Sequence, residues 1–228
     1  MVKPLIAIAG MTLTLMFASA FSSGETLNQY PLHAAAQQDD VTRIEQLLSS
    51  SSKIDARDQS GSTALLVAAR ANSIGAAKAL IDAGADVNAK DHIQDSAYLY
   101  SGARGHLEIL KMTLAHGADL KSTNRYGGTA LIPAAERGHV ETVRTLIEAG
   151  VAIDHVNNLG WTALLEAIIL GDGGKRHQQI VDLLLKAGAN PNLADRDGVT
   201  PLQHARKRGF GEIEDSLLAF QARQNKKN

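Results

Sequence analysis

The sequence predicts an all-α protein in which about six helix–turn–helix units stack into a solenoid. Three observations support this prediction. A polar turn followed by a helix start recurs every 33 residues along most of the chain, and apolar residues recur at helical spacing within each interval. Aromatic residues make up only 4% of the 228 residues, which is typical of thin layers packed through alanine and leucine.

The composition excludes several functional classes. With 23 basic and 24 acidic side chains the formal net charge is −1, so the chain lacks the basic excess of nucleic-acid-binding proteins. It contains no cysteine, which excludes disulfides, thiolate metal sites and thiol nucleophiles. We therefore expect no nucleic-acid partner.

Residues 1–20 have the pattern of a secretory signal peptide. A positive charge at Lys3 precedes an apolar stretch over residues 5–18, and Ala18-Ser19-Ala20 forms a small-x-small cleavage site. A helix of about 14 residues spans only about 21 Å, which is too short for the roughly 30 Å hydrocarbon core of a membrane. We expect cleavage after Ala20, a linker at residues 21–28, and a periplasmic or secreted product without a membrane span.

Six equivalent positions define the repeat. The first five follow one another at intervals of 33 residues and the sixth comes 38 residues later, so five residues are inserted in the fifth unit: Tyr30, Thr63, Ser96, Thr129, Thr162 and Thr200. We expect repeats at 29–57, 58–90, 91–123, 124–156, 157–194 and 195–222, followed by a polar tail at 223–228.

Each unit is expected to contain two helices joined by short turns. The Thr or Ser at the start of the first helix can accept a hydrogen bond from a backbone N–H two or three residues later. Pro31 and Pro201 occupy the first helical position, where a missing N–H costs least. In the second unit we expect helices at 63–71 and 74–83. A glycine just past the second helix can take the left-handed conformation that ends a helix, as at Gly84.

The third and fourth units depart from this pattern. Gln94 stands at the turn position that other units fill with glycine, so we expect a distorted or strained turn there. Tyr98 and Gly102 replace leucine and alanine in the following helix. Pro133 lies four residues after Thr129, so it removes only the first hydrogen bond of its helix and should be tolerated.

The unit resembles the ankyrin repeat. Its start is of the T-P-L-H type, as in Thr200-Pro201-Leu202, and its end is of the G-A-D-x-N type, as in residues 84–88. The resemblance covers residues 29–222. It implies short β-hairpin fingers that project between the units, and partners that bind across the finger tips and the exposed ends of the first helices.

Carried over position by position, the contact places of the family predict a protein-binding site. It consists of Arg104, Arg125, Tyr126, Arg137, Asn158, Leu159, Trp161 and Arg196. Its aromatic, apolar and arginine side chains match the composition that dominates the energetics of protein interfaces. Two alternatives stay open: Trp161 can pack against the neighbouring finger instead, and Glu166 can be a buried acceptor for a finger N–H or a surface contact.

Catalytic and ligand-binding motifs are weak in this sequence. The run from Gly171 to Lys175 resembles a phosphate loop, but no strand precedes it and no Ser or Thr follows Lys175, so we interpret it as an enlarged turn in the fifth unit. The eight histidines have no metal-ligand spacing. We predict no catalytic residue, no metal, no cofactor and no enzymatic activity.

We predict a monomeric, non-catalytic scaffold that is exported to the bacterial envelope and binds a partner protein through its concave finger-and-helix face. Residues 129–139 and 160–168 resemble small exported, periplasmic bacterial ankyrin-repeat proteins, and this resemblance implies protection or regulation of an envelope protein. Two alternatives belong to other classes: an exported effector that acts on a host or rival cell, and a small-ligand or metal enzyme.

Overall fold

The computed structural model describes residues 29–225, so the expected signal peptide at 1–20 and linker at 21–28 lie outside the described residues. Within this range the chain forms twelve helices in six consecutive pairs, and no strand. The pairs are α2 (Pro31–Gln37) with α3 (Val41–Ser49), α4 (Ala64–Ala71) with α5 (Ile74–Asp82), α6 (Ala97–Arg104) with α7 (Leu107–Ala115), α8 (Leu131–Glu136) with α9 (Val140–Glu148), α10 (Ala163–Ile169) with α11 (Lys175–Lys186), and α12 (Pro201–Arg208) with α13 (Gly211–Asn225).

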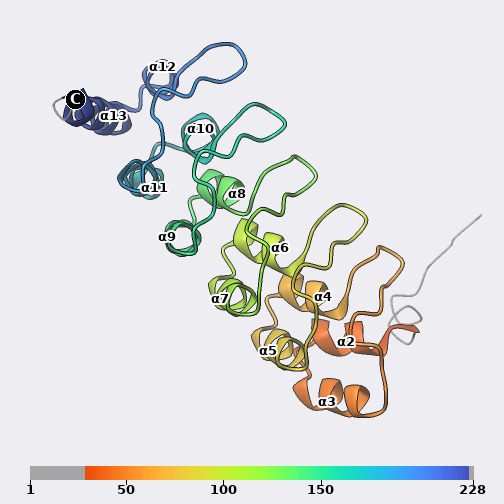
Figure 1. Cartoon of the computed structure of the whole chain (residues 1–228). Helices are drawn as coiled ribbons and strands as arrows, with labels where there is room; N and C mark the ends of the chain where they lie inside the picture. The colour runs from red at the N-terminus through yellow and green to blue at the C-terminus, as the bar shows by residue number, and fades with distance from the viewer. Residues whose placement is uncertain (1–28, 226–228) are drawn as a thin grey trace, which may run out of the picture.

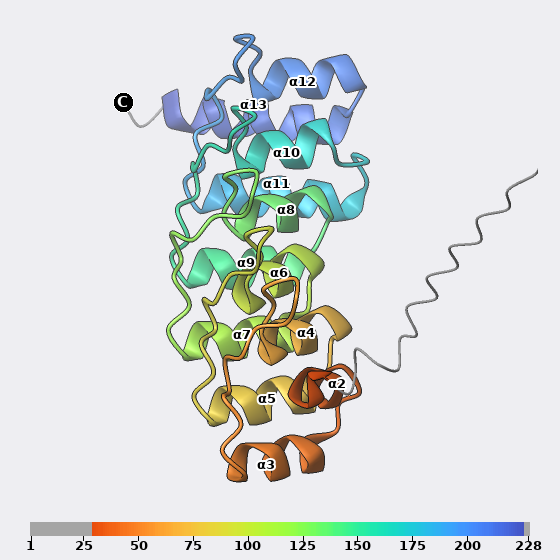
Figure 2. The ribbon, with the colours of Figure 1, turned by 90° about the vertical axis from the view of Figure 1, so that its right-hand side faces the viewer.

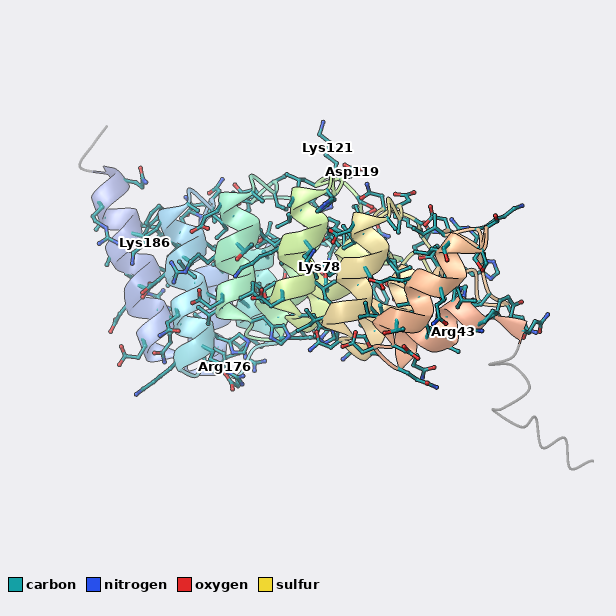
Figure 3. All side chains as sticks on the ribbon, turned by 90° about the horizontal axis from the view of Figure 1, so that it is seen from below. Arg43, Lys78, Asp119, Lys121, Arg176 and Lys186 are labelled. Atoms are coloured by element: carbon teal, nitrogen blue, oxygen red, sulfur yellow. The ribbon has the colours of Figure 1, made fainter. Side chains whose placement is uncertain are left out.

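The six pairs stack along one axis, and a loop projects from the same side of the stack between each pair and the next (Figures 1 and 2). We call these loops fingers; their tips are residues 58–62, 91–95, 124–128, 157–161 and 195–199. The first helix of each pair lies next to the fingers and forms the inner face with them. The second helices form the outer face, where charged side chains such as Lys78 and Lys186 stand exposed to solvent (Figure 3).

The core lies between the two layers of helices and consists mainly of Ala, Leu, Ile and Val. Its buried side chains form two clusters, one extending from Leu32 to Ile109 and the other from Tyr98 to Leu217. The clusters meet in the third repeat. An all-α solenoid is therefore confirmed for the described residues, and its aromatic-poor composition follows from the small side chains that neighbouring layers share.

Most of the predicted helix caps are present. The hydroxyls of Thr63, Ser96 and Thr162 each accept a hydrogen bond from the backbone N–H three residues later. Thr200 forms a complete capping box with Gln203. Tyr30 makes no side-chain cap, and the predicted cap at Thr129 is wrong.

Pro133 is the cause of the exception at Thr129. In the second repeat, Val67 N–H donates to the backbone carbonyl of Thr63 at 3.0 Å, and the other first helices use the same bond. Pro133 has no N–H, so Ile132 N–H donates to the Thr129 carbonyl instead, at 3.2 Å. The hydroxyl of Thr129 is left buried without a hydrogen-bond partner among residues 29–225. Helix α8 still forms, with six residues, so Pro133 is tolerated as predicted.

The prediction of β-hairpin fingers needs correction, because the fingers contain no strand within residues 29–225. In the finger of the second repeat, Asp58 Oδ1 accepts hydrogen bonds from Ser60 N–H at 2.8 Å and Ser62 N–H at 2.9 Å. Two backbone bonds close the loop, from Asp58 N–H to the Ser62 carbonyl at 3.0 Å and from Gly61 N–H to the Asp58 carbonyl at 2.9 Å. The side-chain oxygen of the Asp or Asn that begins each tip thus accepts hydrogen bonds from the backbone N–H groups that would otherwise pair two strands.

The third finger is strained but not distorted. Gln94 adopts φ of 66°, in the left-handed region that favours glycine. The turn keeps the hydrogen bonds of its neighbours, with Asp91 N–H donating to Asp95 O at 2.9 Å and Gln94 N–H donating to Asp91 O at 3.1 Å. The third finger therefore keeps the turn geometry of the other fingers, and Gln94 adopts a strained left-handed backbone conformation as a result.

The five inserted residues of the fifth repeat divide between a turn and a helix. Helix α11 has twelve residues, three more than the nine of α9, so the remaining two enlarge the turn before it. Asp172 Oδ1 accepts a hydrogen bond from Gly174 N–H at 2.9 Å and lies 2.7 Å from His177 Nδ1. A carboxylate thus occupies the start of α11, which makes this turn unsuited to a phosphate. At the other end of the chain, α13 runs to Asn225, three residues past the expected end of the last repeat at 222.

Candidate functional site

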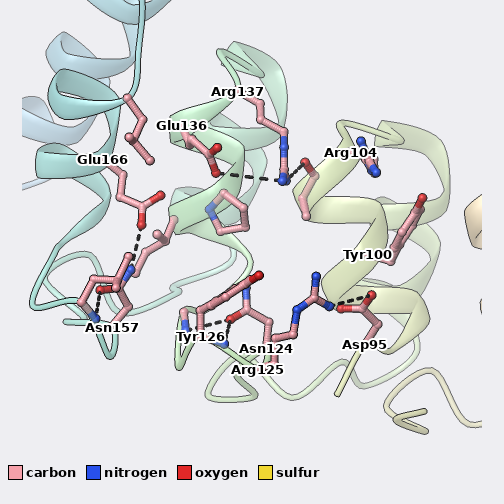
Figure 4. A pocket seen from close by; sticks show the side chains of 16 residues that line it. Asp95, Tyr100, Arg104, Asn124, Arg125, Tyr126, Glu136, Arg137, Asn157 and Glu166 are labelled. Carbon is pink, nitrogen blue, oxygen red and sulfur yellow. Dashed lines mark hydrogen bonds and ion pairs between the residues drawn. The ribbon is translucent and has the colours of Figure 1, made fainter. Parts of the chain in front are cut away.

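A hollow of about 360 Å³ opens on the inner face across the third, fourth and fifth repeats. Helices α6, α8 and α10 form one wall, and the tips of three fingers form the other (Figure 4). The apolar residues of its lining include Ile132, Pro133, Leu159 and Leu170. A concave surface with an apolar floor and charged edges is suited to taking up side chains of a partner.

Five of the eight residues predicted for binding line this hollow: Arg104, Arg125, Tyr126, Arg137 and Leu159. Two of them expose unusually large apolar surfaces, with 55% of Tyr126 and 47% of Leu159 accessible to solvent. Isolated exposed apolar residues are common on protein surfaces, but these two border the same cavity. The structure thus brings together predicted contact residues from three repeats.

The other three predicted residues do not line the hollow. Asn158 and Arg196 each cover the glycine of the preceding finger, because a Cβ on Gly127 would lie 2.4 Å from Asn158 and one on Gly160 would lie 2.6 Å from Arg196. Trp161 is half-buried, and no aromatic contact joins it to Tyr126 within residues 29–225. Trp161 therefore lies outside the hollow that Tyr126 and Leu159 border.

The basic part of the hollow holds three arginines. The guanidinium carbon of Arg104 lies 5.5 Å from the centre of the Tyr100 ring, and that of Arg125 lies 4.9 Å from the Tyr126 ring. Both distances allow a cation–π attraction. Arg137 donates from Nη1 to the Ala103 carbonyl at 2.8 Å, which satisfies an acceptor at the end of α6. Arg137 therefore joins two repeats as well as lining the hollow.

Sequence reasoning missed Tyr100, which lines the hollow beside Arg104, near the carboxylate of Asp95. Asp95 Oδ2 lies 3.9 Å from both Arg70 and Arg125. Burial raises the pKa of Asp95, and the neighbouring carboxylate of Asp91 adds to this rise. The signal that could have identified Tyr100 is its position four residues after Ser96, since the equivalent position of the fifth repeat holds Glu166.

The acidic part of the hollow centres on Glu166, which is 5% exposed. Its Oε1 accepts a hydrogen bond from Asn157 Nδ2 at 2.7 Å, so Glu166 is a buried acceptor for a finger side chain. Burial and, to a smaller extent, the nearby Glu136 carboxylate raise the pKa of Glu166, Asn157 and Arg137 lower it, and the net value is about 7. This carboxyl group gains or loses its proton close to neutral pH.

Histidines serve the stacking of repeats in the described part of the chain. His33 Nε2 bonds the Ser62 carbonyl at 2.9 Å, His106 Nδ1 the Ala69 carbonyl at 2.8 Å, and His177 Nε2 the Glu136 carbonyl at 2.9 Å. Each ring nitrogen faces a carbonyl oxygen and so carries the donated proton. Residues 29–225 contain no group of three or more His, Asp or Glu placed to hold a metal ion.

No helix among the described residues is long and apolar enough to cross a membrane.

A family model described as "Ankyrin repeats (3 copies)" matches residues 2–91 and 98–195, which is more than half of the sequence. The chain belongs to the ankyrin-repeat family. Ankyrin repeats typically mediate protein–protein interactions, and proteins built from them are generally non-catalytic.

Solved ankyrin structures share this arrangement of repeats. An ankyrin repeat domain from Acinetobacter baumannii AYE is 74% identical, covers 85% of this chain and 98% of its own, and superposes with a TM-score of 0.83. The ankyrin repeat protein EF0377 is 44% identical over 83% of this chain and 96% of its own, with a TM-score of 0.80. The ankyrin repeat domain of Bcl-3, a member of the IkappaB family, is 27% identical over 83% and 85% of the two chains, with a TM-score of 0.74.

One curated relative matches over a shorter segment. The ankyrin repeat protein YahD of Escherichia coli (strain K12) is 57% identical over 54 residues, or 24% of this chain and 27% of YahD. The match thus spans about a quarter of that relative. In this ankyrin-repeat protein, the hollow lies where finger tips and first helices meet, on the face that the resemblance assigns to partners.

Proposed function

We propose that this protein is a non-catalytic scaffold that binds a partner protein through its inner face. The observation that carries the proposal is the hollow of about 360 Å³, around which five predicted contact residues from three repeats are assembled. Exposed Tyr126 and Leu159 would supply apolar contact area, and three arginines would supply directional hydrogen bonds. We further propose that residues 1–20 direct export, and that the mature protein acts in the bacterial envelope on a protein that it protects or regulates.

Site-specific crosslinking tests the binding face. A photoreactive phenylalanine analogue placed at Leu159 should trap one discrete partner band in the producing cell, since this exposed side chain borders the hollow. The same analogue at Lys78, on the outer face, is the matched control and should trap none. Equal crosslinking from both positions would contradict an inner-face site.

Variants then test the contribution of the site to affinity. Tyr126→Ala combined with Leu159→Ala should weaken binding of the trapped partner at least tenfold, because both side chains are exposed and their loss removes contact area from the interface. The thermal unfolding midpoint should stay within about 2 °C of the wild type, as expected for exposed positions. Unchanged affinity would place the partner elsewhere.

Export has a separate test. The mature N-terminus, determined by sequencing of the protein purified from its native cell, should be Phe21, and the protein should fractionate with the envelope contents. Retention of Met1 in a cytoplasmic fraction would contradict export without affecting the proposed binding face.

A further inference from the structure

We propose that the hollow binds an acidic segment of the partner protein, with an Asp or Glu side chain placed between Arg104, Arg125 and Arg137 and a neighbouring apolar side chain on the hollow floor. This proposal rests on the proposed protein-binding function and specifies the chemistry of the partner. Charge complementarity carries it: three guanidinium groups from three separate segments border one cavity (Figure 4).

Most hydrogen-bond donors of these arginines are available to a ligand. A guanidinium has five N–H donors. Arg104 makes no hydrogen bond or ion pair to any of residues 29–225, and Arg125 approaches Asp95 only to 3.9 Å. Arg137 uses Nη1 for the Ala103 carbonyl, and its Nη2 lies 4.0 Å from Glu136. A charge-assisted hydrogen bond to a carboxylate is about 2.7–2.9 Å long, so the Arg125–Asp95 pair leaves room for a closer acceptor.

Two of the three arginines are also held in place. Arg104 lies over the ring of Tyr100 and Arg125 over that of Tyr126, at 5.5 Å and 4.9 Å from the ring centres. A guanidinium on an aromatic face keeps its edge, where the N–H groups point, open for a planar, bidentate partner. Less side-chain entropy is then lost on binding than with unrestrained arginines.

The acidic residues around the hollow favour a carboxylate over a more highly charged phosphate. Asp95, Glu136 and Glu166 line the same cavity, so a dianion would meet stronger repulsion than a single carboxylate would. Glu166 lies toward α10, away from Arg104 on α6 (Figure 4). The apolar surfaces of Pro133, Leu159 and Leu170 lie in the same cavity, where an apolar neighbour of the acidic residue would be buried.

Selection from a phage-displayed library of random twelve-residue peptides, with the full chain as bait, tests this chemistry. We expect the selected peptides to share an Asp or Glu next to an apolar residue. Resynthesised peptides should lose at least tenfold in affinity when that acid becomes Asn or Gln. A selection that yields no acid-containing peptides, or no enriched peptide at all, would overturn the proposal.

Variants of the protein locate the binding. Arg104→Gln should weaken binding of the selected peptides at least tenfold. Arg104 is exposed and makes no hydrogen bond or ion pair within residues 29–225, so losing its cation–π contact with Tyr100 should change the thermal midpoint by no more than about 2 °C. Arg144→Gln is the matched control, since Arg144 lies on α9 and pairs only with Glu141 at 3.4 Å; it should change affinity by less than twofold.

The outcomes separate this proposal from the proposed function. If Tyr126→Ala and Leu159→Ala weaken peptide binding but Arg104→Gln leaves the affinity unchanged, the acidic-segment proposal is overturned and the inner-face binding site still stands. Peptides indifferent to all three variants would bind another surface and would contradict both.

Discussion

Gln94 holds the backbone conformation that glycine holds in four other fingers. Its φ of 66° compares with 78° at Gly61, 71° at Gly127, 86° at Gly160 and 74° at Gly198. A left-handed conformation costs a residue with a Cβ about 1–2 kcal/mol. Replacing that residue with glycine removes this cost, but part of the gain is lost because glycine also increases the conformational entropy of the unfolded chain. The third finger therefore stores strain that one side-chain deletion can release.

We predict that Gln94→Gly raises the free energy of unfolding by about 0.5–1 kcal/mol, measured by urea denaturation. Gly198→Ala is the opposite control: nothing lies within 4 Å of the added Cβ, so it should lose about 1 kcal/mol through backbone strain alone. A decrease for Gln94→Gly would mean that the glutamine side chain contributes more through packing than its backbone costs.

Glu166 should make stability depend on pH in a defined window. Its pKa of about 7 in the folded chain exceeds the ordinary value of 4.5, so between these values the folded chain keeps a proton that the unfolded chain has lost. Stability contributed by this group is complete below pH 4.5 and falls as the pH rises to about 7. Glu136 and Arg137 from α8 and Asn157 from the finger face this carboxyl group and set the shift together.

Glu166→Gln keeps the acceptor for Asn157 and removes the charge, so we predict a variant as stable as the wild type at pH 4 and more stable by up to about 3 kcal/mol at pH 8. Urea denaturation across this range measures the difference. Glu141→Gln on the outer face is the control and should leave the pH profile of the wild type unchanged. Parallel profiles for Glu166→Gln and the wild type would show that Glu166 titrates normally.

At the level of elements, local sequence predicted the helices well and their contacts less well. Thr63, Ser96 and Thr162 cap their helices because each cap depends on only four consecutive residues. The cap at Thr129 does not form because Pro133 has no N–H for the Thr129 carbonyl, so the Ile132 N–H bonds that carbonyl instead of the Thr129 hydroxyl. Predicting this requires the hydrogen bonds of the whole first turn. The expected finger strands failed for a similar reason, since side-chain acceptors at the tips take the backbone donors.

The candidate site could be predicted only in part, because some of its residues are placed by contacts between fingers. Arg125, Tyr126 and Leu159 could be placed because finger tips project wherever the repeat is regular. The positions of Asn158 and Arg196 could not, since each packs over a glycine of the neighbouring finger. The sequence left two roles open for Glu166, and its bond to Asn157 of the finger shows that it is the buried acceptor.

Helices α6 and α8 approach each other closely at Gly102. A Cβ at this position would lie 2.8 Å from the Cβ of Ala130, whereas the equivalent residues of the first, second and fourth repeats are alanines. Helix propensity alone favours Gly102→Ala by about 1 kcal/mol. The overlap should outweigh this gain, because forcing an extra carbon into a packed interface costs about 1–3 kcal/mol.

We predict that Gly102→Ala lowers the free energy of unfolding by about 1 kcal/mol, and that adding Ala130→Gly recovers part of the loss. Urea denaturation of the single and double variants gives the coupling. Gly211→Ala is the control, since nothing surrounds its added Cβ, and it should not destabilise. If Gly102→Ala stabilises the protein, the two helices can separate at no cost.

At the level of the whole molecule, the third repeat is a junction between two cores. The cluster from Leu32 to Ile109 and the larger cluster from Tyr98 to Leu217 meet there. Beside this junction lie the strained Gln94 and the buried hydroxyl of Tyr98, which has no hydrogen-bond partner among the described residues. In a solenoid each repeat contacts only its neighbours, so a weak junction limits how far unfolding is cooperative. The N-terminal cluster is smaller and should unfold first.

Trp161, the only tryptophan of the chain, belongs to the fifth repeat and reports on the C-terminal cluster. We predict that its fluorescence changes at a higher urea concentration than the first part of the helical ellipticity does. Leu80→Ala, in the N-terminal cluster, should shift only the early ellipticity change, and Leu184→Ala, in the C-terminal cluster, should shift the fluorescence change. If the fluorescence and ellipticity curves superimpose in the wild type and in both variants, the two clusters are strongly coupled through the third repeat. The irregular residues of that repeat would then cause local strain without reducing cooperativity.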